Sequence, residues 1–340
     1  MHALVTGGGG FLGSGIVDAL LRRGDRVRSL GRGDYPQLAA KGVEVIRGDI
    51  RDSSALATAC EGVDCVFHTA AIAGIGVDRD LYDSINRTGT ELLLAAARRH
   101  GVARFVYTSS PSVTFAGKDQ SGVNEDAPYD FGWMESNRAY YSYTKACAEQ
   151  TVLAANDDTL RTCSLRPHLI WGPGDSHLIP RLLARARNGK LRRVGDGTNL
   201  VDITYIDNAV DAHLQAADAL ANNDQSAATP SPAGKAYFIS QGEPVNCWQW
   251  IDEILALVQL PPVTKSISRA AAERVGSVLE FVYRLAGLQG EPQMSRFLAA
   301  QLSTSHWFDL SAARRDFGYQ PRVSTAEGML QMGKWLRDTA

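Results

Sequence analysis

Thr6-Gly7-Gly8-Gly9-Gly10-Phe11-Leu12-Gly13 follows a short apolar run directly and opens a long amphipathic stretch. Its glycines fit both G-x-G-x-x-G (8, 10, 13) and G-x-x-G-x-x-G (7, 10, 13). One glycine permits a sharp turn, another lets the backbone approach a pyrophosphate, and the last lets helix pack on strand. The first N–H groups of that helix are free to bind an anion. The stretch therefore predicts a dinucleotide site that uses Gly7, Gly10, Phe11, Leu12 and Gly13.

The first half of the chain alternates short β-branched runs with longer helical patterns. The expected strands cover residues 2–6, 26–30, 43–46, 64–68, 104–107 and 161–166, and the clearest helices cover 11–23, 81–100 and 138–155. Short, nearly continuous apolar strands indicate a parallel sheet that is covered on both faces. We expect an α/β fold, a Rossmann-type doubly wound parallel sheet with a smaller, mainly helical C-terminal part. Residues 1–166 are expected to bind the dinucleotide and 167–340 the substrate, with some later segments returning to the sheet.

Composition excludes several other classes of protein. Of 340 residues, 44% are apolar and 21% charged, which is ordinary for a globular chain and excludes disorder. A net charge of −2 gives no basic field for nucleic acid. The five cysteines form no CxxC pair, and the seven histidines have no metal-ligand spacing. With no signal peptide and no membrane span in the sequence, we expect a cytoplasmic protein without a metal.

The end of the second expected strand indicates which dinucleotide is bound. An NAD site typically has a carboxylate at this position, which accepts hydrogen bonds from the ribose hydroxyls. This strand ends Leu30-Gly31-Arg32, and a guanidinium suits the 2′-phosphate of NADP. NADP is therefore favoured over NAD. The alternative is that Arg32 is a solvated surface residue and Asp34 meets the ribose.

A tyrosine and a lysine four residues apart predict acid–base chemistry. In Tyr141-Ser142-Tyr143-Thr144-Lys145 the phenol and the ammonium share one helix face, and a nearby cation is expected to lower the tyrosine pKa. Ser110, directly after the fifth expected strand, places a hydroxyl at the sheet edge where ligands bind. Tyr140 and Tyr143 compete for the acid's role, but neither is four residues from Lys145.

Six ordered motifs resemble the extended short-chain dehydrogenase/reductases, over nearly the whole chain. They are the glycine loop, His68-Thr69-Ala70-Ala71, Asn86-x-x-Gly89-Thr90, Thr108-Ser109-Ser110, Tyr141-x-x-x-Lys145, and Arg166-Pro167 with Trp171-Gly172-Pro173-Gly174-Asp175. The resemblance implies that Ser110, Tyr141 and Lys145 are catalytic. It also implies that Asp49-Ile50 meets the adenine, that Ala70-Ala71 flanks the cofactor and that Pro167 lines the nicotinamide pocket. Asn86 would have a supporting role or simply cap a helix.

The branch of this family is indicated by the stretch after Gly195-Asp196-Gly197. Val201 stands where nucleotide-sugar epimerases and dehydratases usually carry an arginine for the substrate diphosphate. Val201-Asp202-x-Thr204-Tyr205-x-x-Asn208 resembles the 3β-hydroxysteroid dehydrogenase-like branch. Within that branch, residues 107–114, 153–157, 235–240 and 314–319 resemble the bacterial 2-alkyl-3-oxoalkanoate reductases of long-chain olefin biosynthesis. That resemblance implies NADP-linked interconversion of a lipid-like 2-alkyl-3-oxo acid and its 3-hydroxy acid. It also implies a homodimer and partner enzymes of the olefin pathway, with a complex between them left open.

The alternative hypotheses for the function are a hydroxysteroid or sterol-type dehydrogenase, a nucleotide-sugar epimerase or dehydratase, and a cofactor-binding regulator without catalysis. An oxo acid needs a cation for its carboxylate and an apolar channel for its chains. His168, Arg181 and Arg296 are unranked candidates for the cation. The late helical stretch at 270–286 and the residues near 297 could supply the channel or could be plain core.

Overall fold

The computed structural model describes residues 1–74, 76, 78–221, 231–288 and 290–339, and its main sheet is parallel throughout. Seven strands lie in the order β12-β7-β5-β4-β1-β2-β3. Their bounds are β1 His2–Thr6, β2 Arg26–Gly31, β3 Glu44–Arg47, β4 Cys65–His68, β5 Arg104–Thr108, β7 Arg161–Pro167 and β12 Lys235–Ile239. The order reverses at β1 and β4, whose carboxyl ends bound the crevice where ligands of such sheets bind.

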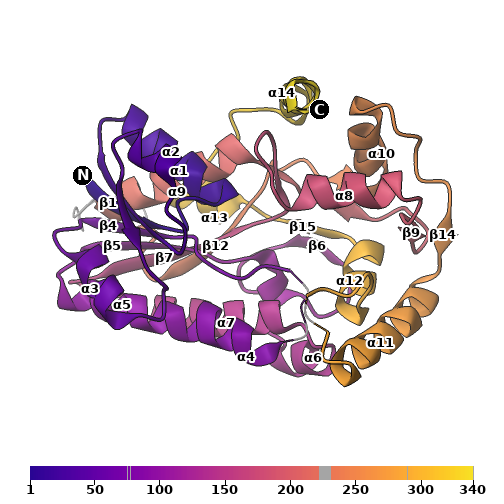
Figure 1. The fold of residues 1–340 in the computed structure, drawn as a ribbon, viewed down its shortest axis with the longest axis horizontal. Helices are drawn as coiled ribbons and strands as arrows, with labels where there is room; N and C mark the ends of the chain where they lie inside the picture. Colours follow the sequence, from indigo (N-terminus) through magenta and orange to yellow (C-terminus); the bar gives the residue numbers. More distant parts are fainter. Residues whose placement is uncertain (75, 77, 222–230, 289, 340) are drawn as a thin grey trace.

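Helices cover both faces of this sheet, as Figure 1 shows. On one face lie α1 Phe11–Arg22, α2 Pro36–Ala39, α9 Ile206–Ala221 and α13 Ser311–Phe317. On the other lie α3 Ser53–Cys60, α5 Gly89–Arg99 and α7 Tyr140–Ala154. Each layer buries its own apolar core against the sheet, with Val5, Ile16 and Val210 in the first, and Leu4, Leu93 and Phe105 in the second. The predicted doubly wound fold is confirmed.

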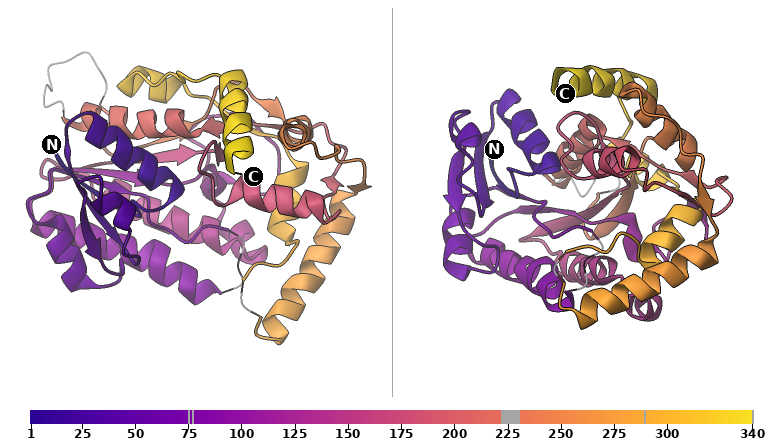
Figure 2. Two further views of the ribbon diagram at one scale, coloured as in Figure 1. Left: turned by 45° about the horizontal axis from the view of Figure 1, so that its top comes forward. Right: turned by 45° about the vertical axis from the view of Figure 1, so that its right-hand side comes forward.

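The second half returns to the main sheet with β12, α9 and α13, and its other elements pack at the carboxyl ends of the strands (Figure 2). They include a four-stranded sheet in the order β13-β10-β15-β6, to which the first half contributes β6, and two small strand pairs. The helices are α8 Leu178–Arg187, α10 Cys247–Leu257, α11 Arg269–Leu285, α12 Arg296–Ser303 and α14 Thr325–Thr339. The small strands are β6 Gln120–Val123, β8 Ile170–Trp171, β9 Arg193–Val194, β10 Leu200–Val201, β11 Thr204–Tyr205, β13 Val245–Asn246, β14 Ser266–Ile267 and β15 His306–Phe308.

The expected long helix over 81–100 is divided in the structure. It consists of α4 Arg79–Tyr82, a π-helical turn over Asp83–Thr88 and α5. The π-helical turn redirects Asn86 so that its side chain bonds to Ile72, a contact that periodicity does not reveal. Two short helical segments, η2 Pro111–Thr114 and α6 Phe131–Ser136, complete the first half. No helix in the described part of the chain is both long and apolar enough to span a bilayer.

The glycine loop fixes how closely α1 approaches β1. Gly7 has a φ of 72°, in the left-handed region that favours glycine. A Cβ on Gly13 would overlap the carbonyl group of Gly7, so any side chain there would push α1 away from the strand. Both glycines are therefore required by the backbone itself.

Gly13→Ala should lower the free energy of unfolding by about 1 to 3 kcal/mol, because the overlap is with backbone that cannot rotate away. Denaturant unfolding of the cofactor-free chain measures the change. The matched control is Gly132→Ala in α6, where the Cβ would meet nothing closer than 3.6 Å. Equal stability of the two variants would contradict this account of the loop.

Candidate active site

The start of α1 is a cradle of free backbone donors. Gly10 precedes the helix without a side-chain cap, so the N–H groups of Phe11, Leu12 and Gly13 have no earlier carbonyl within the helix to bond. Ala70 lies directly beside Gly7, since a Cβ on Gly7 would come within 3.1 Å of its backbone. The structure thus brings the glycine loop and the end of β4 together. A phosphate group fits such a set of N–H donors, aided by the helix dipole.

The predicted adenine residues lie after β3. Asp49 forms an ion pair of 2.7 Å with Arg51, and this pair lowers the pKa of its carboxyl to about 2. Ile50 is buried against Gly89 at the start of α5. Arg32 is exposed and close enough to Asp49 to contribute to that low pKa.

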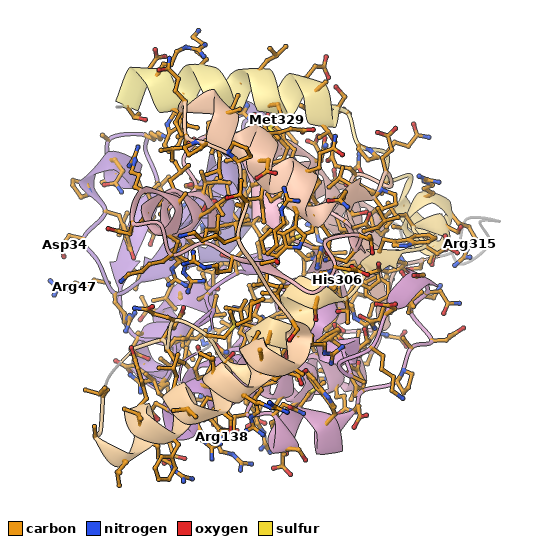
Figure 3. The ribbon with its side chains drawn as sticks, turned by 90° about the vertical axis from the view of Figure 1, so that its right-hand side faces the viewer. Asp34, Arg47, Arg138, His306, Arg315 and Met329 are labelled. Atoms are coloured by element: carbon orange, nitrogen blue, oxygen red, sulfur yellow. The ribbon has the colours of Figure 1, made fainter. Side chains whose placement is uncertain are left out.

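Asp34, the alternative contact for the ribose, is exposed and lies beside Arg47. Its carboxylate pairs with Arg47 at 2.9 Å, and Figure 3 shows the two residues next to each other at the edge of the molecule. The Tyr35 ring instead occupies the space above Gly9, Gly31 and Gly33. Tyr35 was not predicted from the sequence. The one available signal was that Gly31 and Gly33 flank Arg32, because two glycines leave space for an aromatic ring.

Ser110 and Tyr141 meet between the end of β5 and the first turn of α7. The Ser110 hydroxyl is near enough to the Tyr141 hydroxyl to favour the ionised form of the tyrosine. Burial is the larger effect, and it raises the pKa of Tyr141 to about 12. Ser110 also caps the following turn, accepting from the Ser112 N–H at 3.2 Å. Two of the three predicted catalytic groups are therefore neighbours.

Lys145 is buried, and its ammonium points in a different direction from the one expected. Its ammonium donates to the Thr108 carbonyl and lies 4.1 Å from the centre of the Tyr107 ring, so it does not lower the pKa of Tyr141. Burial lowers the pKa of Lys145 itself to about 7, although Glu149 opposes that effect. The predicted lowering of the tyrosine pKa is wrong for the chain without cofactor, because desolvation outweighs a cation that points elsewhere.

The competing tyrosines are placed differently. Tyr143 packs edge-on against Phe131, with ring centres 5.3 Å apart, and Arg79 lies over its face. Tyr140 lines the same pocket as Tyr141, and both are half-buried. Among the three, Tyr141 is the one whose ionisation Ser110 favours.

Asn86 supports the site from the π-helical turn. Its side-chain oxygen accepts from the Ile72 N–H at 2.8 Å, and its amide donates to Ile72 O at 3.0 Å and to Thr144 Oγ1 at 3.2 Å. It thereby ties the loop after Ala70-Ala71 to α7. Pro167 is buried at the end of β7, beside Ile239 of β12.

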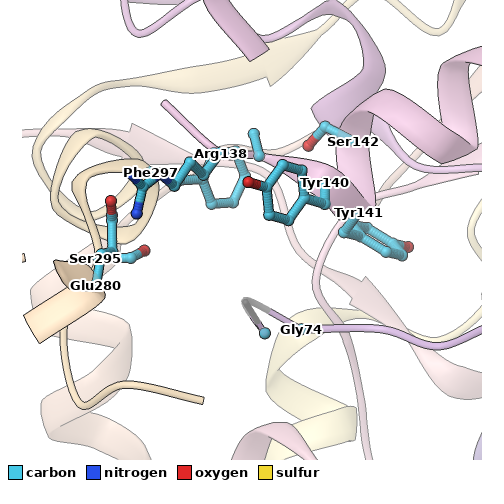
Figure 4. Close-up of a pocket in the computed structure, with 10 residues that line it drawn as sticks. Gly74, Arg138, Tyr140, Tyr141, Ser142, Glu280, Ser295 and Phe297 are labelled. Atoms are coloured by element: carbon cyan, nitrogen blue, oxygen red, sulfur yellow. The ribbon is translucent and has the colours of Figure 1, made fainter. Parts of the chain in front are cut away.

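A narrow pocket opens beside Tyr141 toward the C-terminal helices. Figure 4 shows Arg138, Glu280, Ser295 and Phe297 at one side of it and Tyr141 at the other. Arg138 has a φ of 52°, which is unusual for a residue with a side chain. Among the described residues that line the pocket, it supplies the only cationic side chain. Sequence reasoning missed it, because nothing in its pattern marks strain.

The three cation candidates do not face this pocket as free charges. His168 is buried against Asp202 O and His306, and burial lowers its pKa to about 3, so the ring is neutral. Arg181 pairs with Glu291 at 2.7 Å, and Arg296 pairs with Glu280 at 3.0 Å. The structure assigns none of them to a substrate carboxylate.

The chain is similar to known proteins over most of its length. Residues 4–262 match the model of the 3-beta hydroxysteroid dehydrogenase/isomerase family. A protein of Stenotrophomonas maltophilia (strain K279a) named 2-alkyl-3-oxoalkanoate reductase is 50% identical over 334 residues, 98% of this chain and 98% of that protein. Its namesake in Shewanella oneidensis is 48% identical over 338 residues, 97% of this chain and 85% of that protein.

The fold is shared with enzymes of known structure. A dTDP-glucose 4,6-dehydratase from Streptomyces venezuelae, solved with NAD bound, superposes with a TM-score of 0.75 at 24% identity, over 99% of this chain and 97% of that one. This likeness concerns the fold alone. The family model and the two relatives span most of the chain, including the glycine loop, Ser110, Tyr141 and Lys145. The chain belongs to the 3-beta hydroxysteroid dehydrogenase/isomerase family.

Proposed function

We propose that this chain is an NADP-dependent oxidoreductase that interconverts a 2-alkyl-3-oxoalkanoate and its 2-alkyl-3-hydroxyalkanoate. The observation that carries the proposal is that Ser110, which follows β5, and Tyr141 of α7 are neighbours at the same edge of the sheet as the free N–H groups of α1. The substrate class rests on the two relatives of that name. In this proposal residues 1–166 hold the cofactor, and the substrate lies between them and residues 167–340.

The chain's own groups can supply every proton that the reduction needs. When bound, NADPH supplies the hydride to the substrate carbon. Burial keeps Tyr141 protonated at neutral pH, which suits a group that donates a proton to the substrate oxygen. Ser110 holds that oxygen as negative charge develops on it. In the oxidation direction the Tyr141 phenolate takes the proton from the substrate hydroxyl and becomes the phenol again.

The dinucleotide would be held by residues at the ends of four strands, β1, β3, β4 and β7. The N–H groups of Phe11, Leu12 and Gly13 would bind the pyrophosphate, with Gly7 and Gly10 giving it room. Asp49 and Ile50 would meet the adenine, while Ala70, Ala71 and Pro167 would flank the rest. Lys145 would turn to the nicotinamide ribose from its present contact with Thr108.

A 3β-hydroxysteroid dehydrogenase is the second candidate, because the matching family model carries that description. The same Ser110–Tyr141 pair would act on a rigid polycyclic alcohol. Turnover of racemic 2-alkyl-3-hydroxy acids against a sterol panel, with NADP⁺ reduction followed at the nicotinamide absorbance, separates the two. Turnover of sterols alone would overturn the main proposal.

Tyr141→Phe should lower kcat by about a thousandfold while NADP⁺ still binds, because the variant loses its exchangeable proton but keeps its ring. Steady-state oxidation of a 2-alkyl-3-hydroxy acid and a separate NADP⁺ titration measure the two effects. Tyr143→Phe is the matched control, since that ring packs on Phe131 and should leave kcat unchanged. Normal turnover by Tyr141→Phe would remove it from the mechanism.

Arg32→Asp should raise the KM for NADP⁺ by about tenfold to a hundredfold and lower the KM for NAD⁺, because it exchanges a cation for a carboxylate at the ribose position. Initial rates with both cofactors give the ratio. Arg26→Asp, exposed at the opposite end of β2, serves as the control. An unchanged preference in Arg32→Asp would show that another residue selects the cofactor.

Lys145→Met should stabilise the cofactor-free chain at pH 7 by about 4 kcal/mol, because a buried ammonium is costly. Between the folded pKa of about 7 and the ordinary 10.5, the unfolded chain binds more protons, so native stability rises with pH. The difference between the variant and the native chain should therefore shrink as the pH rises from 7 to 10.

Urea unfolding at several pH values measures this change, with the exposed Lys118→Met as control. A stability difference that stays constant over this range would mean that Lys145 titrates at its ordinary pKa in the fold.

A further inference from the structure

The outer face of α11 exposes large apolar side chains to solvent. This α11 outer face is defined by five residues, with exposed fractions given in order: Val275 45%, Val278 62%, Phe281 52%, Val282 44% and Leu285 77%. At helical spacing all five point the same way. Leu288, in the turn that follows, is 45% exposed and continues the surface. Isolated apolar residues on a surface are common, but a contiguous group of this kind marks an interaction site.

The opposite side of α11 packs against the rest of the fold. Ala272, Gly276 and Glu280 are buried, and a Cβ on Gly276 would overlap the backbone of Ser295 and Arg296 at the start of α12. The orientation of the helix is therefore fixed by close packing. Figure 1 shows α11 at the periphery, on the lower right of the molecule. Its apolar face is exposed because of this packing and cannot turn inward.

The charges of α11 are divided between its two sides. Both acids of the helix are engaged away from the outer face, Glu273 with Arg269 at 2.7 Å and Glu280 with Arg296 at 3.0 Å. The exposed charges among the apolar residues are Arg274 and Arg284, and the latter lies over the Phe281 ring. The outer face is thus apolar and cationic, although the whole chain has a net charge of −2.

We propose that the α11 outer face docks on an anionic lipid surface. A helix whose exposed side combines large apolar residues with arginines is suited to lie in the interface, with its side chains among the acyl chains and its guanidinium groups at the phosphates. A protein partner would need an acidic apolar groove to match the same face. The lipid surface is favoured because the exposed charges among these apolar side chains are the two arginines, which match the phosphates of anionic lipids.

Docking would place the pocket next to the lipid. Glu280 on the inner side of α11 lines the pocket that contains Tyr141, so one helix would contact the bilayer outside and the site inside. A lipid-like substrate would then travel a short way from bilayer to site, a consequence that rests on the proposed function. The docking itself is independent of the reaction.

Co-sedimentation of the full chain with vesicles tests the proposal. We expect binding to phosphatidylcholine vesicles with about one third phosphatidylglycerol, weaker binding to phosphatidylcholine alone, and loss of the difference at high salt. The double variant Phe281→Ser/Leu285→Ser should bind at least about tenfold more weakly to both. Arg274→Gln/Arg284→Gln should lose the preference for anionic vesicles, with about fivefold weaker binding per arginine.

Leu330→Ser is the matched control, because Leu330 is 74% exposed on α14, remote from α11 in Figure 1. It should bind vesicles as the native chain does. Thermal unfolding and NADP⁺ binding of all variants check the fold, since none of these side chains touches the proposed cofactor site. Absence of vesicle binding by the native chain, or equal binding by the α11 variants, would overturn the proposal.

Analytical ultracentrifugation tests the remaining explanation, which is that a second copy of the chain covers the α11 outer face. If a second copy of the chain covers the face, Phe281→Ser/Leu285→Ser changes the oligomeric state and the native chain ignores vesicles, which also overturns the proposal. Failure of either kind leaves hydride transfer by the native chain intact, and so is distinguishable from failure of the proposed function.

Discussion

The position of Ser110 beside Tyr141 brings together two parts of the chain on which the whole site depends. Ser110 follows β5, near the centre of the sheet, and Tyr141 is in the first turn of α7. One turn beyond Lys145, Glu149 forms a fully buried ion pair of 2.7 Å with Arg166 of β7. Tyr129 and Ser164 donate to the same carboxylate at 2.8 and 2.6 Å. Because α7 is fixed in this way, its first turn is held where β5 ends.

Sheet order explains why distant motifs meet. β4 lies between β1 and β5, so the glycine loop, Ala70 and Ser110 follow three adjacent strands at the same edge. These features could be predicted from sequence, because strand periodicity and glycine spacing are local properties. The six strands predicted in the first half accordingly end within one residue of their observed bounds, whereas β12 was not predicted as a strand. Small, weakly patterned segments such as α3, Ser-Ser-Ala-Leu-Ala-Thr-Ala-Cys, were not predicted, since their helices depend on tertiary packing.

The details of the site were less accessible from sequence. Tyr35 lies over three glycines and Arg138 adopts a left-handed backbone, and both depend on contacts that no spacing encodes. The pKa of Tyr141 shows the same limit. A lysine four residues away suggested a lowered value, but the structure turns Lys145 to Thr108 and buries the phenol. The tyrosine pKa depends on where the lysine side chain points and on how far water is excluded from the phenol, and residue spacing shows neither.

The account centres on hydride transfer to a substrate oxo group held by Ser110 and Tyr141. The most direct test incubates the native chain with NADPH carrying deuterium on its transferable C4 position and a 2-alkyl-3-oxo acid, followed by mass spectrometry of the product. The account predicts a 3-hydroxy acid with one deuterium on C3. A product without deuterium with either C4 epimer of the cofactor, or no product while sterol substrates react, would contradict it.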